Sequence, residues 1–277
     1  MRGVEYVPSS RRSPVSLHCV GLSVEQTAPL LSSSMSYDGD AVDTSPPRYA
    51  PREVSVDVNA LDRGAWDSAC EAFEADCASG APGSLFCEGW YARAYCVSQE
   101  AREVSPSYVT GTLTFALLDG YWSKSEAFEF YRSESDPGDA EFLDYPHDYP
   151  HDYAAPFDSV GITNDQLVGS PARIVVYGPV TNPTLSIGGN TYRWEVEVPS
   201  GSYLACDFTE ARKTIEIVGN GYTRDVFDSG VRGSGLGGGS YCFQPIPPGS
   251  SAVSWDGSFG FTVYLEKRRG GLPWTSS

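Results

Sequence analysis

The chain is poor in the side chains on which most enzyme active sites depend. Its 277 residues include three histidines, His18 near the N-terminus and His147 and His151 in a stretch rich in Asp, Tyr and Pro. A Ser-His-Asp or Cys-His arrangement would therefore have to take its base from a loop. A pair of carboxylates across a cleft could act on a sugar, as in a glycosidase, but sequence spacing does not show such a pair. The sequence predicts no catalytic residue, and we expect a protein that is not an enzyme.

Positive charge is also scarce. The chain has 19 Lys and Arg against 36 Asp and Glu, which gives a formal net charge of -17. Because nucleic-acid binding depends on cations that neutralise phosphates, this balance argues against direct contact with DNA or RNA. No apolar run reaches the length of a membrane span, and residues 1–34 lack the apolar core of a signal peptide. We expect a soluble protein that is not exported by a cleavable signal.

None of the seven cysteines stands in the close C-x2–4-C pair that is typical of a zinc site. Seven is an odd number, so they cannot all pair within one chain. We expect buried or half-buried thiols, as in a protein that folds in a reducing cytoplasm. A metal or disulfide role is the alternative. The seven are Cys19, Cys70, Cys77, Cys87, Cys96, Cys206 and Cys242.

Two motifs resemble ligand sites, and both have simpler explanations. Residues 144–153 repeat Asp-Tyr-Pro-His, but the prolines keep the segment extended, so His147 and His151 cannot close around one metal ion. Residues 233–238 match the GxGxxG pattern of dinucleotide sites. They lead into residues 241–243, which we expect to be a strand and not the helix that would bind a phosphate. We therefore predict no metal and no cofactor.

The last third of the chain alternates between apolar and polar residues in short runs. Residues 192–198 and 259–265 have this pattern, with Tyr192, Trp194 and two valines on one side of the first of these runs, and residues 172–177 form a mostly apolar run. Gly, Pro and Asn separate the runs. Several short strands at close spacing predict a β-sandwich or jelly roll.

The first half combines strands with one helix. Residues 53–58, 84–86, 91–98 and 108–118 read as strands. Between the first two, we expect a helix with Asn59 as its N-cap and an end at Ser79–Gly80. Its apolar stripe consists of Trp66, Ala69, Cys70, Phe73 and Cys77.

The breaks between these segments predict four regions. Residues 1–50 read as turns or an extended N-terminal arm, and residues 51–132 form an α+β domain. The Asp/Tyr/Pro-rich residues 133–160 form an extended linker. Residues 161–277 form the C-terminal β-sandwich domain. The fold class is therefore mainly β, with one α+β part.

Short motifs in a shared order resemble the distal tail proteins, or tail hubs, of long-tailed siphophages and prophages of Gram-positive bacteria. The resemblance spans residues 50–274 and is closer in the second half. Two features depart from it: residues 269–274 lack the acidic ending that is frequent in the family, and residues 1–50 match nothing in it. The motifs that carry the resemblance are residues 81–85, 89–90, 93–95, 113–122, 172–183, 187–192, 201–204, 213–215, 226–228, 246–249 and 253–259.

The resemblance implies a structural role in the virion tail, after synthesis in the cytoplasm of the bacterial host. Such proteins form a ring of identical copies, usually a hexamer, closed by the N-terminal domain around the tail channel. The C-terminal domain, a galectin-like or jelly-roll sandwich, projects outward. The implied partners are further copies of the chain, the tail tube protein, and tail-tip or tail-associated lysin and receptor-binding proteins. A channel that passes DNA should not bind it, so we expect a net negative lumen.

A carbohydrate-binding module of the tail tip, which recognises host cell-wall glycans, is the alternative function. Aromatic rings can stack on sugars, although most such residues are core or interface aromatics. The candidate stacking residues are Tyr192, Trp194, Tyr203 and Trp255.

Overall fold

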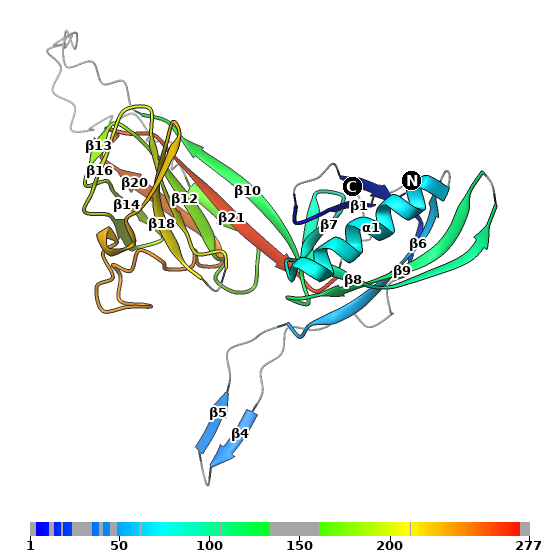
Figure 1. The fold of residues 1–277 in the computed structure, drawn as a ribbon. Helices are drawn as coiled ribbons and strands as arrows, with labels where there is room; N and C mark the ends of the chain where they lie inside the picture. Colours follow the sequence, from blue (N-terminus) through cyan, green and yellow to red (C-terminus); the bar gives the residue numbers. More distant parts are fainter. Residues whose placement is uncertain are drawn as a thin grey trace, which may run out of the picture. The chain divides into compact units, whose positions relative to one another are not determined.

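The computed structural model describes residues 4–10, 14–17, 19–23, 35–38, 41–44, 49–60, 63–105, 107–132, 161–210 and 212–271 (Figure 1). These residues form antiparallel sheets with one α-helix, so the prediction of a mainly β protein is confirmed. The chain divides into two compact units. Unit 1 comprises Met1–Lys124 and Arg268–Ser277, and unit 2 comprises Ser125–Lys267.

Unit 1 is built on a sheet of antiparallel strands paired in the order β2-β1-β7-β8-β9-β6-β3. Along β6, β7 and β9 every second residue is buried, which is the pattern of a sheet with one face against a core. Strands β4 (Met35–Asp38) and β5 (Ala41–Thr44) form a separate hairpin. The strands of the main sheet are β1 (Val4–Val7), β2 (Val15–Leu17), β3 (Cys19–Ser23), β6 (Arg52–Ala60), β7 (Gly83–Cys87), β8 (Trp90–Val104) and β9 (Val109–Leu117).

Helix α1 (Arg63–Ser79) packs on β8 and β6 of this sheet (Figure 1). It ends as predicted at Ser79–Gly80, where Gly80 has φ +67°, a conformation that favours glycine. The predicted N-cap is wrong, because Asn59 pairs with Thr110 inside β6 and the helix begins at Arg63.

The buried stripe of α1 differs from the predicted one. It consists of Ala69, Ala72, Phe73 and Asp76, whereas Cys77 is exposed. The spacing i, i+3, i+4, i+7 is that of one helix face. Because Asp76 is acidic, the sequence pattern did not place it in the core.

Asp76 on α1 forms hydrogen bonds with the N-terminal segment. Its carboxylate accepts hydrogen bonds from the Tyr6 hydroxyl (2.7 Å) and the Ser9 hydroxyl (2.6 Å), and its two oxygens lie 3.1 Å from the Ser9 backbone nitrogen. Burial, together with this carboxylate, raises the pKa of Tyr6. The Tyr6 ring packs edge-on against Phe73, with 4.9 Å between centroids, and beside Phe115 at 5.6 Å. Strand β1, which was not among the predicted strands, is thus part of the core of unit 1.

Unit 2 contains two main sheets. One has the order β19-β18-β17-β12-β21-β10 and the other has the order β11-β20-β14-β15. Strands β13 (Val180–Thr181) and β16 (Glu197–Val198) form a small third sheet. The strands of the main sheets are β10 (Trp122–Phe130), β11 (Gly161–Asn164), β12 (Ala172–Tyr177), β14 (Thr184–Ile187), β15 (Asn190–Arg193), β17 (Tyr203–Asp207), β18 (Thr214–Gly219), β19 (Tyr222–Asp225), β20 (Gly249–Trp255) and β21 (Phe261–Arg269).

Both sheets contribute to one apolar core. Ile174 of β12 and Leu204 of β17 come from the first sheet, and Ile187 of β14 comes from the second. The predicted strand over residues 172–177 is confirmed. The side chains predicted to share one face of residues 259–265 are all buried, namely Phe259, Phe261, Val263 and Leu265. The predicted single strand over residues 192–198 is wrong, because β15 pairs with β14 whereas β16 pairs with β13.

One lysine is held between two carboxylates in unit 2. The Lys267 Nζ on β21 lies 2.7 Å from Glu126 of β10 and 3.0 Å from Asp165 after β11. Its side chain is 15% exposed. Burial lowers the pKa of Lys267, but hydrogen bonds to the two carboxylates outweigh this and leave the pKa raised.

No helix within the described parts of the chain has the length and apolar character needed to cross a membrane.

Candidate functional site

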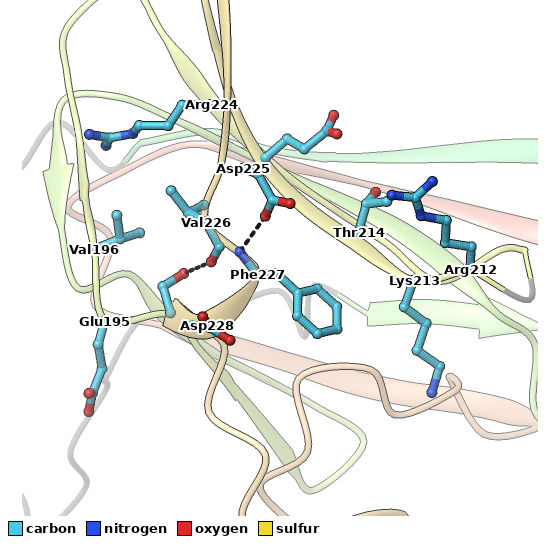
Figure 2. A pocket seen from close by; sticks show the side chains of 12 residues that line it. Glu195, Val196, Arg212, Lys213, Thr214, Arg224, Asp225, Val226, Phe227 and Asp228 are labelled. Atoms are coloured by element: carbon cyan, nitrogen blue, oxygen red, sulfur yellow. Dashed lines mark hydrogen bonds between the residues drawn. The ribbon is translucent and has the colours of Figure 1, made fainter.

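A pocket of about 920 Å³ lies in unit 2, where three segments of the chain meet (Figure 2). The segments are residues 195–196, the start of β18, and the end of β19 with the following 3-10 helix η1 (Phe227–Ser229). In Figure 2, Phe227 lies between Arg224 on one side and Lys213 on the other. The lining residues are Glu195, Val196, Arg212, Lys213, Thr214, Glu216, Arg224, Asp225, Val226, Phe227, Asp228 and Ser229.

A tight hairpin and two local hydrogen bonds shape this pocket. Gly221, at φ +82°, turns β18 back into β19, so that Glu216 is paired with Asp225, nine positions later. The Asp225 carboxylate then accepts the backbone N–H of Phe227 at 2.8 Å (Figure 2). The Ser229 hydroxyl donates to the Val226 carbonyl at 2.7 Å. These bonds fix the chain where it leaves the sheet and begins η1.

The Phe227 ring contacts an aromatic ring and a guanidinium group. It stacks on Phe243 with 5.6 Å between centroids, and the Arg232 guanidinium lies 4.5 Å from its centroid. Both contacts stabilise the ring as part of the wall. Phe227 therefore closes the pocket and is not a free platform for a ligand.

The remaining lining is charged with both signs. Glu195 pairs with Arg193 at 3.3 Å, and Asp228 pairs with Arg232 at 4.0 Å, both at the surface. Lys213 donates to the Tyr241 hydroxyl at 3.0 Å. The lining contains neither histidine nor cysteine, so it offers no base that titrates near neutral pH and no thiolate. The geometry suits contact with a polar partner and shows no arrangement of a nucleophile with a base.

The four candidate stacking residues do not come together in this pocket, because none of them lines it. Tyr192 and Trp194 are 0% exposed, so neither presents a ring face to a sugar. The Tyr192 hydroxyl donates to the Gln244 carbonyl at 2.7 Å, and burial raises its pKa. Tyr203 is half-buried. Trp255 is also half-buried and packs on Phe130 and Phe261, with centroids 5.8 and 5.2 Å away.

The GxGxxG motif forms consecutive turns. The Gly235 N–H donates to the Arg232 carbonyl at 2.9 Å, and the Gly238 N–H donates to the Gly235 carbonyl at 3.0 Å. The strand expected at residues 241–243 is wrong, because the Gln244 N–H bonds back to the Tyr241 carbonyl and makes a further turn. The described residues that follow the motif, up to residue 271, contain strands and turns but no helix whose dipole could bind a phosphate.

The cysteines are mostly core residues. Cys70, Cys77, Cys96, Cys206 and Cys242 are free thiols, and Cys87, Cys96, Cys206 and Cys242 are buried, as predicted. Cys77 is exposed and departs from that prediction. Among the described residues, no three His, Cys, Asp or Glu side chains gather as ligands for a metal. The linker histidines and Cys19 lie outside the described side chains.

The pocket itself was not predicted. The turn at residues 220–221 carries a sequence signal for a hairpin, but the register that brings residues 212–216 beside residues 224–229 does not. A search for clustered charges on both arms of a predicted hairpin could have found part of the lining.

Comparison with known proteins gives a structural likeness only. No protein-family model and no curated protein matches the sequence. Chains in two structures of the phage p2 baseplate in its activated conformation, with strontium and with calcium, match with TM-score 0.56 and 10% and 9% identity. Both matches cover 96% of this chain and 98% of the other.

The SPP1 Dit protein, described as a paradigm of hub adsorption apparatus in phages that infect Gram-positive bacteria, matches with TM-score 0.51 and 8% identity. The match covers 96% of this chain and 99% of that one. The structural neighbours are thus phage baseplate and hub proteins, and the chain has their fold along nearly its whole length. This confirms the fold likeness that the sequence resemblance predicts.

Proposed function

We propose that the protein is a distal tail hub, a structural component that joins the tail tube of a siphophage or prophage to its tail tip and host-adhesion apparatus. The observation that carries the proposal is the coverage of the fold match, which reaches 96% of this chain and 98–99% of the neighbouring chains. A shared module would match only part of each chain. The motif order along residues 50–274 supports the same role independently.

In this proposal, residues 51–132 form the ring-closing α+β domain, and residues 161–277 form a galectin-like or jelly-roll domain that projects outward. Strands β1, β2 and β3, which lie in the predicted N-terminal arm, instead belong to the sheet of this domain, and residues 133–160 are the linker. Six copies form the ring, with the tail tube protein on one side and tail-tip, lysin or receptor-binding proteins on the other. The presence of a separate apolar core in each compact unit supports a division into two domains, with residues 125–132 belonging to the second unit and residues 268–277 to the first.

The protein acts as a scaffold and not as an enzyme, and it resides in the virion tail after synthesis in the host cytoplasm. Its net charge of -17 supports a ring whose lumen is negative and does not retain passing DNA. The pocket of unit 2, which has no histidine or cysteine in its lining, supports a role in contact more than in catalysis.

Native mass spectrometry and negative-stain imaging of the purified chain test the ring. We expect a closed ring with a mass of six copies of the 29.9 kDa chain. A chain that stays monomeric at every concentration, alone and when mixed with the tube and tip proteins of the same phage, would contradict the proposal.

Titration with cell-wall polysaccharide tests the carbohydrate-binding alternative. The hub proposal expects no binding that depends on the two half-buried candidates. Saturable binding that Tyr203→Ala or Trp255→Ala weakens at least tenfold, without a change in the circular dichroism spectrum, would favour the alternative.

A further inference from the structure

Cysteines come together where helix α1 packs on β8. Cys77 lies in the last turns of α1 and Cys96 lies on β8. The Cys77 Sγ is 3.7 Å from the backbone oxygen of Cys96. Both side chains line a cavity of about 380 Å³, together with Phe73, Glu74 and residues 97–99. A small molecule that enters this cavity therefore meets both thiols.

The two thiols differ in accessibility. Cys77 is exposed, whereas Cys96 is 5% exposed. Burial raises the pKa of Cys96 to about 12, so this sulfur stays protonated at neutral pH. Reagents in solution reach Cys77 first, and Cys96 lines the same cavity.

We propose that Cys77 and Cys96 are an oxidisable pair that closes to a disulfide when the folded protein meets a peroxide. In the first step the Cys77 thiolate attacks one peroxide oxygen, the O–O bond breaks, and hydroxide leaves, so that Cys77 carries a sulfenic acid. In the second step the Cys96 sulfur attacks Cys77, the S–O bond breaks, and the leaving hydroxide takes the Cys96 proton as water. Two electrons pass from the thiols to the peroxide, and two waters form for each disulfide.

The consequence is a covalent bond between the end of α1 and β8. The bond closes a loop of about 20 residues and restricts the unfolded chain more than the folded one. The melting temperature of unit 1 should rise by several degrees on oxidation. The inference stands on the geometry of unit 1 and does not rest on the proposed tail-hub function.

Hydrogen peroxide treatment of the purified full-length chain tests the pair. After free thiols are blocked with iodoacetamide, we expect mass spectrometry to show one cross-linked peptide pair that contains Cys77 and Cys96. The mass falls by two hydrogens, a phosphine reductant reverses the change, and the melting temperature rises with the cross-link.

Three variants make the assignment specific. Cys77→Ser should lose both the cross-link and the thermal shift. Cys70→Ser, seven residues and about two turns earlier on the same helix, should retain both. Cys96→Ala should accumulate a sulfenic acid on Cys77 that dimedone traps. Circular dichroism of the reduced variants checks that each has folded.

Other results would overturn the proposal. Oxidation of Cys77 in the native sequence to a sulfinic acid without a cross-link would show that Cys96 does not resolve it. A disulfide between Cys96 and Cys70, or a cross-link at Cys96 that persists in Cys77→Ser, would show that Cys77 is not the partner of Cys96.

Discussion

Replacing Asp76 by alanine should destabilise unit 1 far more than replacing any exposed acid of the same helix. Asp76 is 1% exposed and accepts hydrogen bonds from the hydroxyls of Tyr6 and Ser9 and from the Ser9 backbone. The alanine variant leaves these donors without their acceptor. The loss therefore falls on β1 and on the turn that follows it.

The magnitude follows from the burial of each donor. Tyr6 is 0% exposed, and its hydroxyl has one other acceptor, the Ala94 carbonyl at the longer distance of 3.4 Å. A buried donor that loses a charged acceptor costs about 2–3 kcal/mol, and Ser9, which is half-buried, can turn toward water at a smaller cost. We expect Asp76→Ala to lower the free energy of unfolding by about 3 kcal/mol, a large part of the stability of a typical domain.

Urea unfolding followed by far-ultraviolet circular dichroism measures this loss. The two compact units can unfold in separate transitions, so the change must appear in the transition that carries the helical signal. Glu71→Ala is the matched control, because Glu71 is exposed on the same helix and its loss should change the free energy of unfolding by less than about 0.5 kcal/mol.

A double-mutant cycle with Tyr6→Phe isolates the bond between the two side chains. We expect a coupling energy of about 1–2 kcal/mol, because the two groups are in direct contact in one network. If Asp76→Ala and Glu71→Ala unfold at the same urea concentration, or if the coupling is near zero, the carboxylate does not hold the N-terminal strand as argued.

Three further perturbations test other parts of the structure. Burial raises the pKa of the Cys96 thiol to about 12 in the folded state, so above about pH 9 the unfolded chain loses this proton while the folded state keeps it. The stability that this thiol contributes is therefore complete below about pH 9 and is lost as the pH rises above it. Cys96→Ala should reduce the loss of stability between pH 9 and 11 in urea titrations. An alanine at Gly83 would place its Cβ against the Tyr6 hydroxyl and the Asp76 carboxylate, so Gly83→Ala should lower the free energy of unfolding by about 2 kcal/mol. Gly89→Ala should lower it by only about 1 kcal/mol, because Gly89 has φ +78° but open space around its Cβ position. Lys267→Met leaves two carboxylates close together and should destabilise unit 2 by about 1–2 kcal/mol, whereas Arg193→Met, in an exposed pair, should cost less than about 0.5 kcal/mol; equal losses for the two variants would contradict this reasoning.

The correctly predicted strands are those whose own residues show a hydrophobic pattern that is typical of a strand. Residues 53–58 alternate between buried and partly exposed positions, and residues 172–177 form a mostly apolar run with three consecutive buried residues. Both patterns are visible without knowledge of any partner strand. The end of the helix was predictable for the same reason, because Gly80 follows the last apolar position and adopts a positive φ.

The elements that were missed depend on partners far along the chain. Strand β1 is four residues long, and it is a strand because it pairs with β7, about 80 residues later. Residues 192–198 alternate as expected, but two different partners divide them into β15 and β16. Asn59 has the chemistry of a helix cap, and the nine-residue pairing of β6 with β9 overrides it.

The pocket of unit 2 shows the same dependence. Its charged residues are spread over residues 195–229, and only the β18–β19 register brings them together. Asp76 was hidden by a related effect, because a buried acid is recognisable only once its donors are known. Sequence patterns therefore predict faces of single elements more reliably than they predict sites that several elements build.

The low identity to the structural neighbours has a physical explanation with a consequence for partner binding. A sheet that packs on a core needs alternation and suitable volume at its inward positions, and many apolar combinations satisfy both. The fold can thus persist at 8–10% identity along 96% of the chain. Outward positions have no such constraint except the surfaces that they contact, so they change together with those surfaces. Under the proposed tail-hub role, the partners of this protein should carry charge complementary to its net charge of -17 and to the mixed charges of the unit 2 pocket.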